Sequence, residues 1–88
     1  MSFFVYLLIT KQKNKLISYV GYTSNLQKRL KLHNTSKGAK FTKGRKWKLI
    51  YMEKLNSKSE AISREYYIKN NKTLRNKIIN ENINFITL

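Results

Sequence analysis

The chain contains no aspartate, so four glutamates supply all of its side-chain carboxylates: Glu53, Glu60, Glu65 and Glu81. Any divalent cation bound through a side-chain carboxylate must use one of these four. On the helix predicted from Ser57 onward, Glu65 falls among the apolar side chains rather than on the solvent face. A carboxylate in that position has either a structural partner or a chemical task. Glu65 is therefore the leading candidate for a metal ligand.

Three further polar side chains fall where the hydrophobic pattern predicts core: Tyr6, Tyr19 and Arg29. A guanidinium can bind two phosphate oxygens at once. His33 follows Arg29 by one helical turn and falls within the same inward arc. Each residue also has a purely structural interpretation: the tyrosines as rim aromatics, and Arg29 with Glu65 as a buried ion pair.

The other glutamates are weaker candidates. Glu60 precedes Arg64 by four residues, which is typical of a solvated ion pair on a helix. Glu53 shares a predicted strand face with Leu49 and Tyr51 and is the second-best metal candidate, while Glu81 is expected to be solvated.

The charge of the chain indicates its class of partner. Nineteen Lys and Arg against four acidic residues give a net charge of +15, which favours nucleic acid over an anionic membrane. Eighty-eight residues predict a single domain, residues 1–88. The longest apolar run, residues 3–9, is too short to span a bilayer. A cytoplasmic protein that does not enter membranes is expected, and its oligomeric state stays open.

The elements that must position these side chains follow from the pattern. Strands are predicted over residues 3–10 and 16–22, joined as a hairpin. If the turn centres on Gln12 and Lys13, Tyr6 lies directly opposite Tyr19, and in a register shifted by two residues the pair still shares one face. A helix is expected from Ser24, whose spacing to Gln27 fits a capping box.

A third strand is predicted over residues 48–55, and two further helices over residues 57–69 and 73–80. The second helix opens with another capping box, Ser57 with Glu60. In the loop between the first helix and the third strand, cations alternate with aromatics. Lys37, Lys40, Lys43, Arg45 and Lys46 are expected to contact a nucleic-acid backbone, and Trp47 is expected to lie in the core.

In this order the residues resemble the GIY-YIG endonuclease domain. The hairpin carries Phe4-Val5-Tyr6 and Tyr19-Val20-Gly21, and the helix from Leu26 to Asn34 resembles the arginine helix of that family. The stretches 38–45, 47–51 and 60–69 resemble its small stand-alone members, so the resemblance covers almost the whole chain. Two departures are Phe4 in place of the first glycine and Tyr22 where the branch of the repair protein UvrC carries lysine.

The resemblance implies an α+β fold, with a three-stranded antiparallel sheet flanked by helices. It also implies metal-dependent hydrolysis of DNA phosphodiesters, selective for structure or weakly specific, in DNA repair or recombination. Glu65 would bind Mg²⁺ or Mn²⁺ and Arg29 would contact the scissile phosphate. Tyr6 and Tyr19 would position or deprotonate the attacking water, with His33 in the same site. RNA stays open as a substrate, and the alternative function is a non-catalytic basic nucleic-acid-binding module with the same fold.

Overall fold

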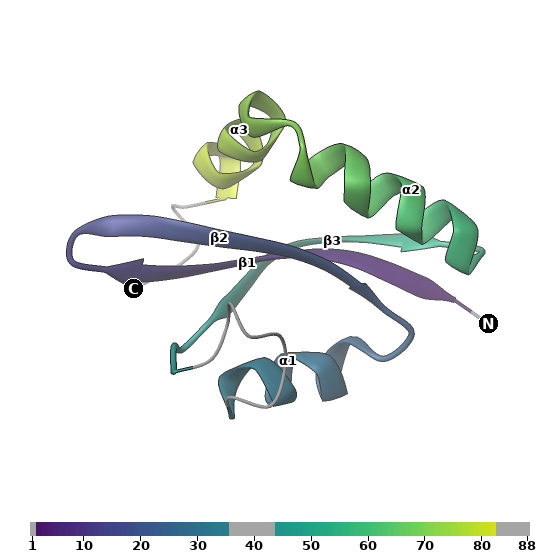
Figure 1. The fold of residues 1–88 in the computed structure, drawn as a ribbon, viewed down its shortest axis with the longest axis horizontal. Coiled ribbons are helices and arrows are strands. Elements are labelled where there is room, and N and C mark those ends of the chain that lie inside the picture. Colours follow the sequence, from purple (N-terminus) through teal and green to yellow (C-terminus); the bar gives the residue numbers. More distant parts are fainter. Residues whose placement is uncertain (1, 36–43, 83–88) are drawn as a thin grey trace.

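The computed structural model describes residues 2–35 and 44–82 and has an α+β architecture. Three strands form one antiparallel sheet in the order β2-β1-β3, namely β1 (Phe3–Gln12), β2 (Lys15–Thr23) and β3 (Lys48–Leu55). Three helices flank this sheet, namely α1 (Leu26–Asn34), α2 (Lys58–Lys69) and α3 (Lys72–Asn82). Helix α1 covers one face, and α2 and α3 cover the other (Figure 1). The predicted fold class is confirmed.

The β1–β2 hairpin turns one residue later than expected. Lys13 and Asn14 both have positive φ, 51° and 67°, which is the two-residue turn whose twist matches that of the flanking strands. Direct pairing of Tyr6 with Tyr19 required a turn at Gln12 and Lys13; the register is instead the one shifted by two residues, and Tyr6 lies opposite Gly21. Tyr19 lies opposite Leu8 and keeps the same face of the sheet as Tyr6.

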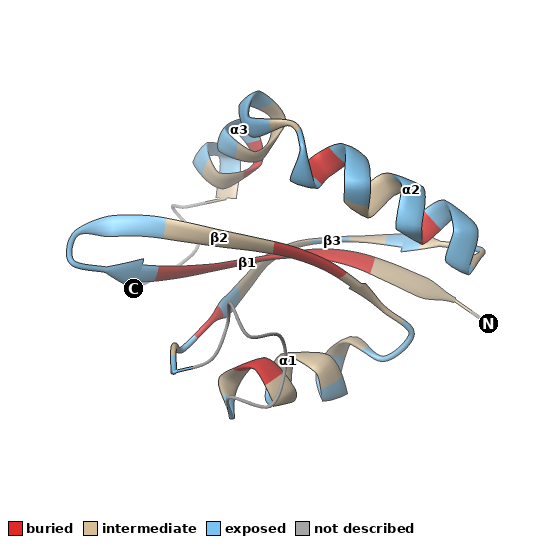
Figure 2. Ribbon diagram, in the orientation of Figure 1, coloured by how far each residue is buried: buried red, intermediate tan, exposed pale blue. Residues whose placement is uncertain are grey.

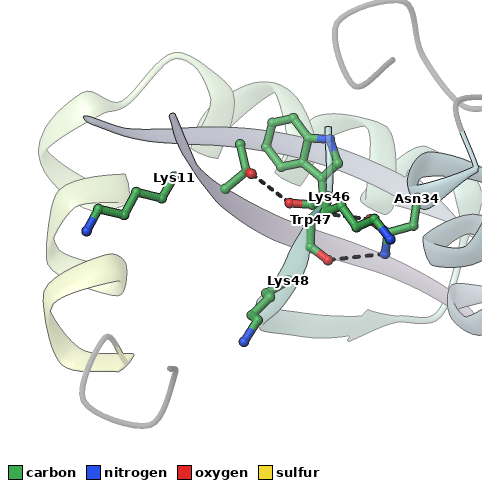
Figure 3. Close-up of a pocket in the computed structure, with 6 residues that line it drawn as sticks. Lys11, Asn34, Lys46, Trp47 and Lys48 are labelled. Atoms are coloured by element: carbon green, nitrogen blue, oxygen red, sulfur yellow. Dashed lines mark hydrogen bonds between the residues drawn. The ribbon is translucent and has the colours of Figure 1, made fainter. Parts of the chain in front are cut away.

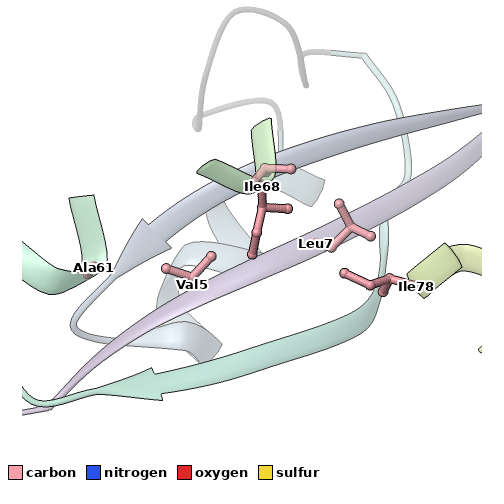
Figure 4. Packing of buried hydrophobic residues seen from close by; sticks show 6 residues of the cluster. Val5, Leu7, Ala61, Ile68 and Ile78 are labelled. Atoms are coloured by element: carbon pink, nitrogen blue, oxygen red, sulfur yellow. The ribbon is translucent and has the colours of Figure 1, made fainter. Parts of the chain in front are cut away.

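Strand β1 is buried on both faces, as its continuous apolar run predicted (Figure 2). Val5 and Leu7 pack against Ala61, Ile68 and Ile78 of α2 and α3 (Figure 4). Burying one such side chain fully contributes about 1.5–3 kcal/mol. This first layer fixes α2, the helix that carries Glu65, against the sheet.

The second layer lies under α1. Tyr6 and Leu8 pack with Trp47, and partly buried side chains from α1 and the neighbouring strands complete the cluster. Trp47 is buried, which confirms its predicted core position. Because Tyr6 belongs to this layer, its hydroxyl group lies inside the molecule rather than at the rim.

The helix starts show one correct and one incorrect prediction. Ser57 caps α2, since its hydroxyl accepts from the Glu60 backbone N–H at 3.1 Å, as predicted. The expected capping box of Ser24 with Gln27 is wrong, because the side chain of Asn25 accepts from the Lys28 N–H and begins α1 one residue later.

In the described ranges, no helix has the length and apolar character needed to cross a membrane.

Candidate functional site

Tyr6 is the centre of the candidate site. Its side chain is almost completely buried, and its hydroxyl lies 2.8 Å from Nε2 of His33, the last buried residue of α1. Gly21 makes room for this ring, because a Cβ there would lie 2.4 Å from the Tyr6 hydroxyl oxygen and 2.6 Å from Cζ. Gly21, the last residue of the motif Tyr19-Val20-Gly21, therefore supplies the space in which Tyr6 meets His33.

Tyr19 and Trp47 extend this contact into an aromatic cluster. The ring centroids of Tyr19 and His33 are 5.1 Å apart, and those of Tyr6 and Tyr19 are 6.4 Å apart. Trp47 meets Tyr19 edge-on at 6.3 Å. The structure thus brings Tyr6, Tyr19 and His33 together, as the shared strand face and the inward arc of the helix predicted.

Arg29 joins the cluster from the preceding turn of α1. The residue is half-buried, and within the described ranges its Nε atom is buried without a hydrogen-bond partner. A buried guanidinium N–H that finds no acceptor is costly. A phosphate oxygen bound at this position would satisfy it. The described residues contain no ion pair between Arg29 and Glu65, so these two residues do not form the buried ion pair that was the structural alternative.

The electrostatics of the cluster favour neutral side chains. Burial raises the pKa of Tyr6 to about 12, although a hydrogen bond from Arg29 and its positive charge act in the opposite direction. Burial likewise raises the pKa of Tyr19. Burial, followed by the charge of Arg29, lowers the pKa of His33 below its usual value. At neutral pH both phenols therefore hold their protons, and the imidazole is uncharged.

Glu65 approaches this cluster from the other side of the sheet. Ala61 and Ile68 are the buried residues of α2 and mark the side of the helix that faces the sheet. Since successive residues are rotated by about 100°, Arg64 and Glu65 lie on opposite flanks of this buried side. Arg64 reaches Glu53 of the edge strand β3, so the Glu65 flank is turned toward β2, the edge strand on the other side of β1. Burial is the main cause that raises the pKa of Tyr6 and Tyr19, and the negative charge of Glu65 acts in the same direction.

Glu53 has a structural task instead. Its carboxylate accepts hydrogen bonds from Arg64 at 2.7 and 2.9 Å and from the Tyr51 hydroxyl at 2.5 Å. The expected pairing of Arg64 with Glu60 is therefore replaced by a forked contact with Glu53. Because these hydrogen bonds occupy its carboxylate, Glu53 is a weaker metal candidate than Glu65, which forms no ion pair with a described residue. One signal for the contact between Tyr51 and Glu53 was present in the sequence, since the two residues share a strand face.

The described residues contain no group of three or more histidine or acidic side chains that could enclose a cation. Glu65 is half-buried and forms no ion pair with any described residue. A single carboxylate fits a hard cation that keeps most of its water, as Mg²⁺ does. It does not fit a cation enclosed by protein ligands.

Five cations were predicted to contact nucleic acid. Lys37, Lys40 and Lys43 lie outside the described residues. Arg45 and Lys46 line a hollow of about 330 Å³ beside Thr10 and Lys11. Lys11, which the sequence did not single out, lines the same hollow.

Comparison with known proteins supports one family. The model of the GIY-YIG catalytic domain matches residues 2–78. A UPF0213 protein of Clostridium perfringens is 52% identical over 65 residues, which is 73% of this chain and 69% of that protein. A UPF0213 protein of Oceanobacillus iheyensis is 45% identical over 75% of this chain and 74% of its own length. The solution NMR structure of a UPF0213 protein from Bacillus halodurans shares 30% identity, with a TM-score of 0.49 over 92% of this chain and 84% of that chain.

The predicted resemblance is thus confirmed. The printed names of these relatives state no activity. The matched region includes Tyr6, Tyr19, Arg29, His33 and Glu65. The chain belongs to the GIY-YIG family, a family of nucleases.

Proposed function

We propose that this protein is a divalent-metal-dependent endonuclease that hydrolyses DNA phosphodiester bonds. One observation carries the proposal: a buried arginine nitrogen without a partner lies beside the hydrogen-bonded Tyr6–His33 pair. Membership of a nuclease family and a charge of +15 support it further. A structural core has no need of an unsatisfied guanidinium, whereas a site for a phosphate diester does.

Arg29 would bind the scissile phosphate. Its guanidinium is already held beside the Tyr6 hydroxyl, so little side-chain freedom is lost when a phosphate arrives. Two N–H groups on neighbouring phosphate oxygens would neutralise the charge that develops on the pentavalent phosphate.

Tyr6, Tyr19 and His33 would handle the attacking water. Tyr6 is protonated at neutral pH, so it cannot serve as a base alone. Its hydroxyl can donate to Nε2 of neutral His33 while its oxygen accepts from the water, and the proton then passes from water through Tyr6 to the imidazole. Tyr19 would hold the water in line with the phosphate.

Glu65 would bind the metal, Mg²⁺ or Mn²⁺, together with water and the substrate phosphate. When bound, such a cation supplies charge stabilisation for the phosphate and the leaving oxygen. Glu65 fits this role because it is half-buried and forms no ion pair with a described residue.

The substrate class follows from charge rather than from a reading of bases. The cations of residues 37–46 would contact the backbone without specifying sequence. Selectivity for structure, such as branches, flaps or single strands, is proposed, with a task in DNA repair or recombination.

The test is incubation of the protein with branched, nicked, single-stranded and duplex DNA, and with RNA of the same sequence, in Mg²⁺ or Mn²⁺. The proposal predicts internal cleavage of at least one DNA and its loss in EDTA. Binding of every substrate without cleavage would refute it and would favour the non-catalytic nucleic-acid-binding module.

A further inference from the structure

Two tyrosines that follow one another on α2 lie in different surroundings. Tyr66 is 69% exposed and Tyr67 is 52% exposed, and Tyr66 is the most exposed large hydrophobic residue that the structure describes. The ring of Tyr67 has a structural partner, because the guanidinium carbon of Arg64 lies 5.3 Å from its centroid. Within residues 2–35 and 44–82, the ring of Tyr66 has no such partner.

Tyr66 belongs to a short row of side chains beside Glu65. Ile62 stands three residues before Glu65 and Lys69 stands four residues after it, so both are its neighbours on the helix surface. By the same spacing, Tyr66 is a neighbour of Ile62 and of Lys69. All three are exposed, and they lie on the flank of α2 that is turned toward β2. We refer to Ile62, Tyr66 and Lys69 as the tyrosine row.

A hollow of about 360 Å³ lies at the end of the tyrosine row, between β2 and the place where α2 meets α3 (Figure 1). It is lined by Ser18, Tyr19, Val20, Lys69 and Arg75. Nη1 of Arg75 donates to the carbonyl of Ile68 at 3.1 Å and to that of Lys69, which ties α3 to the end of α2. The other two guanidinium nitrogens of Arg75 donate to no described residue.

The charge around the tyrosine row is suited to an anion. No glutamate lines the hollow, and within the described ranges Lys69 and Glu65 form no ion pair. A cation at the end of a helix stabilises its last carbonyls, and one nitrogen of Arg75 has that purpose. An exposed ring beside the cations adds nothing to such a cap. Cations with an adjacent aromatic ring are instead the combination that holds single-stranded nucleic acid, through its phosphates and through a stacked base.

The apolar part of the tyrosine row is small for a protein partner. Only Ile62 and Tyr66 contribute to it, and one aromatic side chain covers about 150–250 Å². A stable protein interface needs about 800 Å² from each partner. One base stacks on one ring, so Tyr66 is sufficient for a nucleotide. The net charge of +15 also favours a polyanion.

We propose that Tyr66 stacks on an unpaired base of the substrate near the cleaved bond, while Lys69 and Arg75 bind the phosphates beside that base. This inference rests on the proposed function for the position of the cut, because the tyrosine row lies beside Glu65 and Tyr19 lines the same hollow. The strand that reaches α2 is single-stranded, since a base within a duplex is stacked between its neighbours. Tyr66 is a positioning residue and takes no part in the chemistry.

The test uses three labelled DNAs of about 12 nucleotides. They are a single strand, a strand of the same length with stable abasic residues at every position, and a duplex. The abasic strand keeps the phosphates and lacks the bases, so it separates the two kinds of contact. Affinity is measured by anisotropy between about 50 and 200 mM salt. EDTA is present, so the result does not depend on cleavage.

The variant Tyr66→Ala is compared with Tyr67→Ala, which removes the same ring from the other flank of α2. Tyr66→Ala should weaken binding of the single strand by about fivefold or more and leave the abasic strand and the duplex within about twofold of the wild type. Tyr66→Phe keeps the ring and should bind like the wild type. Tyr67→Ala should change the affinity for each of the three DNAs by less than about twofold.

The phosphate contact is tested with Lys69→Gln against Lys77→Gln, an exposed lysine of α3 outside the hollow. Lys69→Gln should weaken the single strand and the abasic strand alike and lower the salt slope by about 0.7, whereas Lys77→Gln should leave the slope nearly unchanged. The four substituted residues are exposed, so the variants are expected to fold, and thermal unfolding checks this.

Several results would overturn the inference. Equal loss in Tyr66→Ala and Tyr67→Ala, or equal loss on the normal and abasic strands, would show that no base stacks on Tyr66. Unchanged affinity of Tyr66→Ala for every DNA would leave the exposed ring to a protein partner. Displacement of the single strand by an equal concentration of AMP would assign the tyrosine row to a free nucleotide. If no DNA is cleaved but the tyrosine variants behave as expected, the proposed nuclease fails while the tyrosine row stands as a nucleic-acid site.

Discussion

Gly21 is the position in the candidate site where the structure leaves no room for a larger residue. In the substitution Gly21→Ala, the new methyl group would start 2.4 Å from the Tyr6 hydroxyl oxygen, and contacts under 3.0 Å are essentially never found. The oxygen must therefore retreat by about 0.6 Å or more. Its hydrogen bond to His33, now 2.8 Å, would lengthen toward 3.4 Å if the retreat is directed away from Nε2, which is close to the limit of a useful bond.

The expected cost combines two opposing effects. A loosened bond between buried groups and a crowded core cost about 1–3 kcal/mol. The loss of glycine freedom in the unfolded chain returns about 0.4–1 kcal/mol, because Gly21 does not have a positive φ and its backbone conformation suits alanine. We expect net destabilisation of about 1–2 kcal/mol. Because Tyr6 moves, cleavage should fall by about a hundredfold or more.

The measurement is a double-mutant cycle by urea unfolding, with Gly21→Ala made in the wild type and in a Tyr6→Leu background. Leucine lacks the ring end that the methyl group meets, so there the alanine should cost nothing or stabilise slightly. A cost of the same size in both backgrounds would show that the close approach of Tyr6 is not what requires glycine. Full activity of the single variant would refute the placement of Tyr6.

The remaining predictions concern three other residues. Glu53→Gln removes the acceptor of Arg64 and should cost about 1–3 kcal/mol of unfolding free energy, measured by urea, while cleavage per folded molecule is unchanged. Burial opposes ionisation of Glu53, but the hydrogen bonds from Arg64 and Tyr51 prevail and lower its pKa, so its stabilisation is present above about pH 4.5 and is lost as the pH falls through the folded pKa. The pKa of His33 is lowered by burial, so the unfolded chain takes up the proton first, and stability should fall with a slope of at most about 1.4 kcal/mol per pH unit below about pH 6.5. His33 is the sole histidine, and a flat profile over pH 7.5–5.5 in the wild type would contradict its burial. Arg29→Lys keeps the charge but loses the fork, and should lower kcat by about a hundredfold without changing the unfolding midpoint.

The sequence predicted the strands and helices well because their signals are local. The apolar run of β1 indicated a central strand, and Ser57 with Glu60 marked the start of α2. The inward placement of Arg29 and His33 followed from helical periodicity alone. The pairing of Tyr6 and Tyr19 on one face survived a wrong register, because a shift of two residues preserves the side of every side chain.

What could not be predicted depends on contacts between distant segments. The register was set by the positive φ angles of Lys13 and Asn14, a turn that composition only weakly favours. Arg64 had two glutamates within reach, and only the packing of α2 on β3 decided for Glu53. Thr10, Asn34 and Trp47 come from three segments distant in sequence and line one hollow (Figure 3), and no periodicity relates them.

The most direct test of the central claim compares Glu65→Gln with Glu81→Gln in cleavage assays at saturating Mg²⁺ or Mn²⁺. Glu81 is an exposed glutamate on α3, so its variant makes the same change of charge away from the site. The account predicts that Glu81→Gln cleaves like the wild type, while Glu65→Gln binds DNA with similar affinity and does not cleave it. Cleavage by Glu65→Gln at the wild-type rate would contradict the assignment of the metal to Glu65 and with it the proposed site.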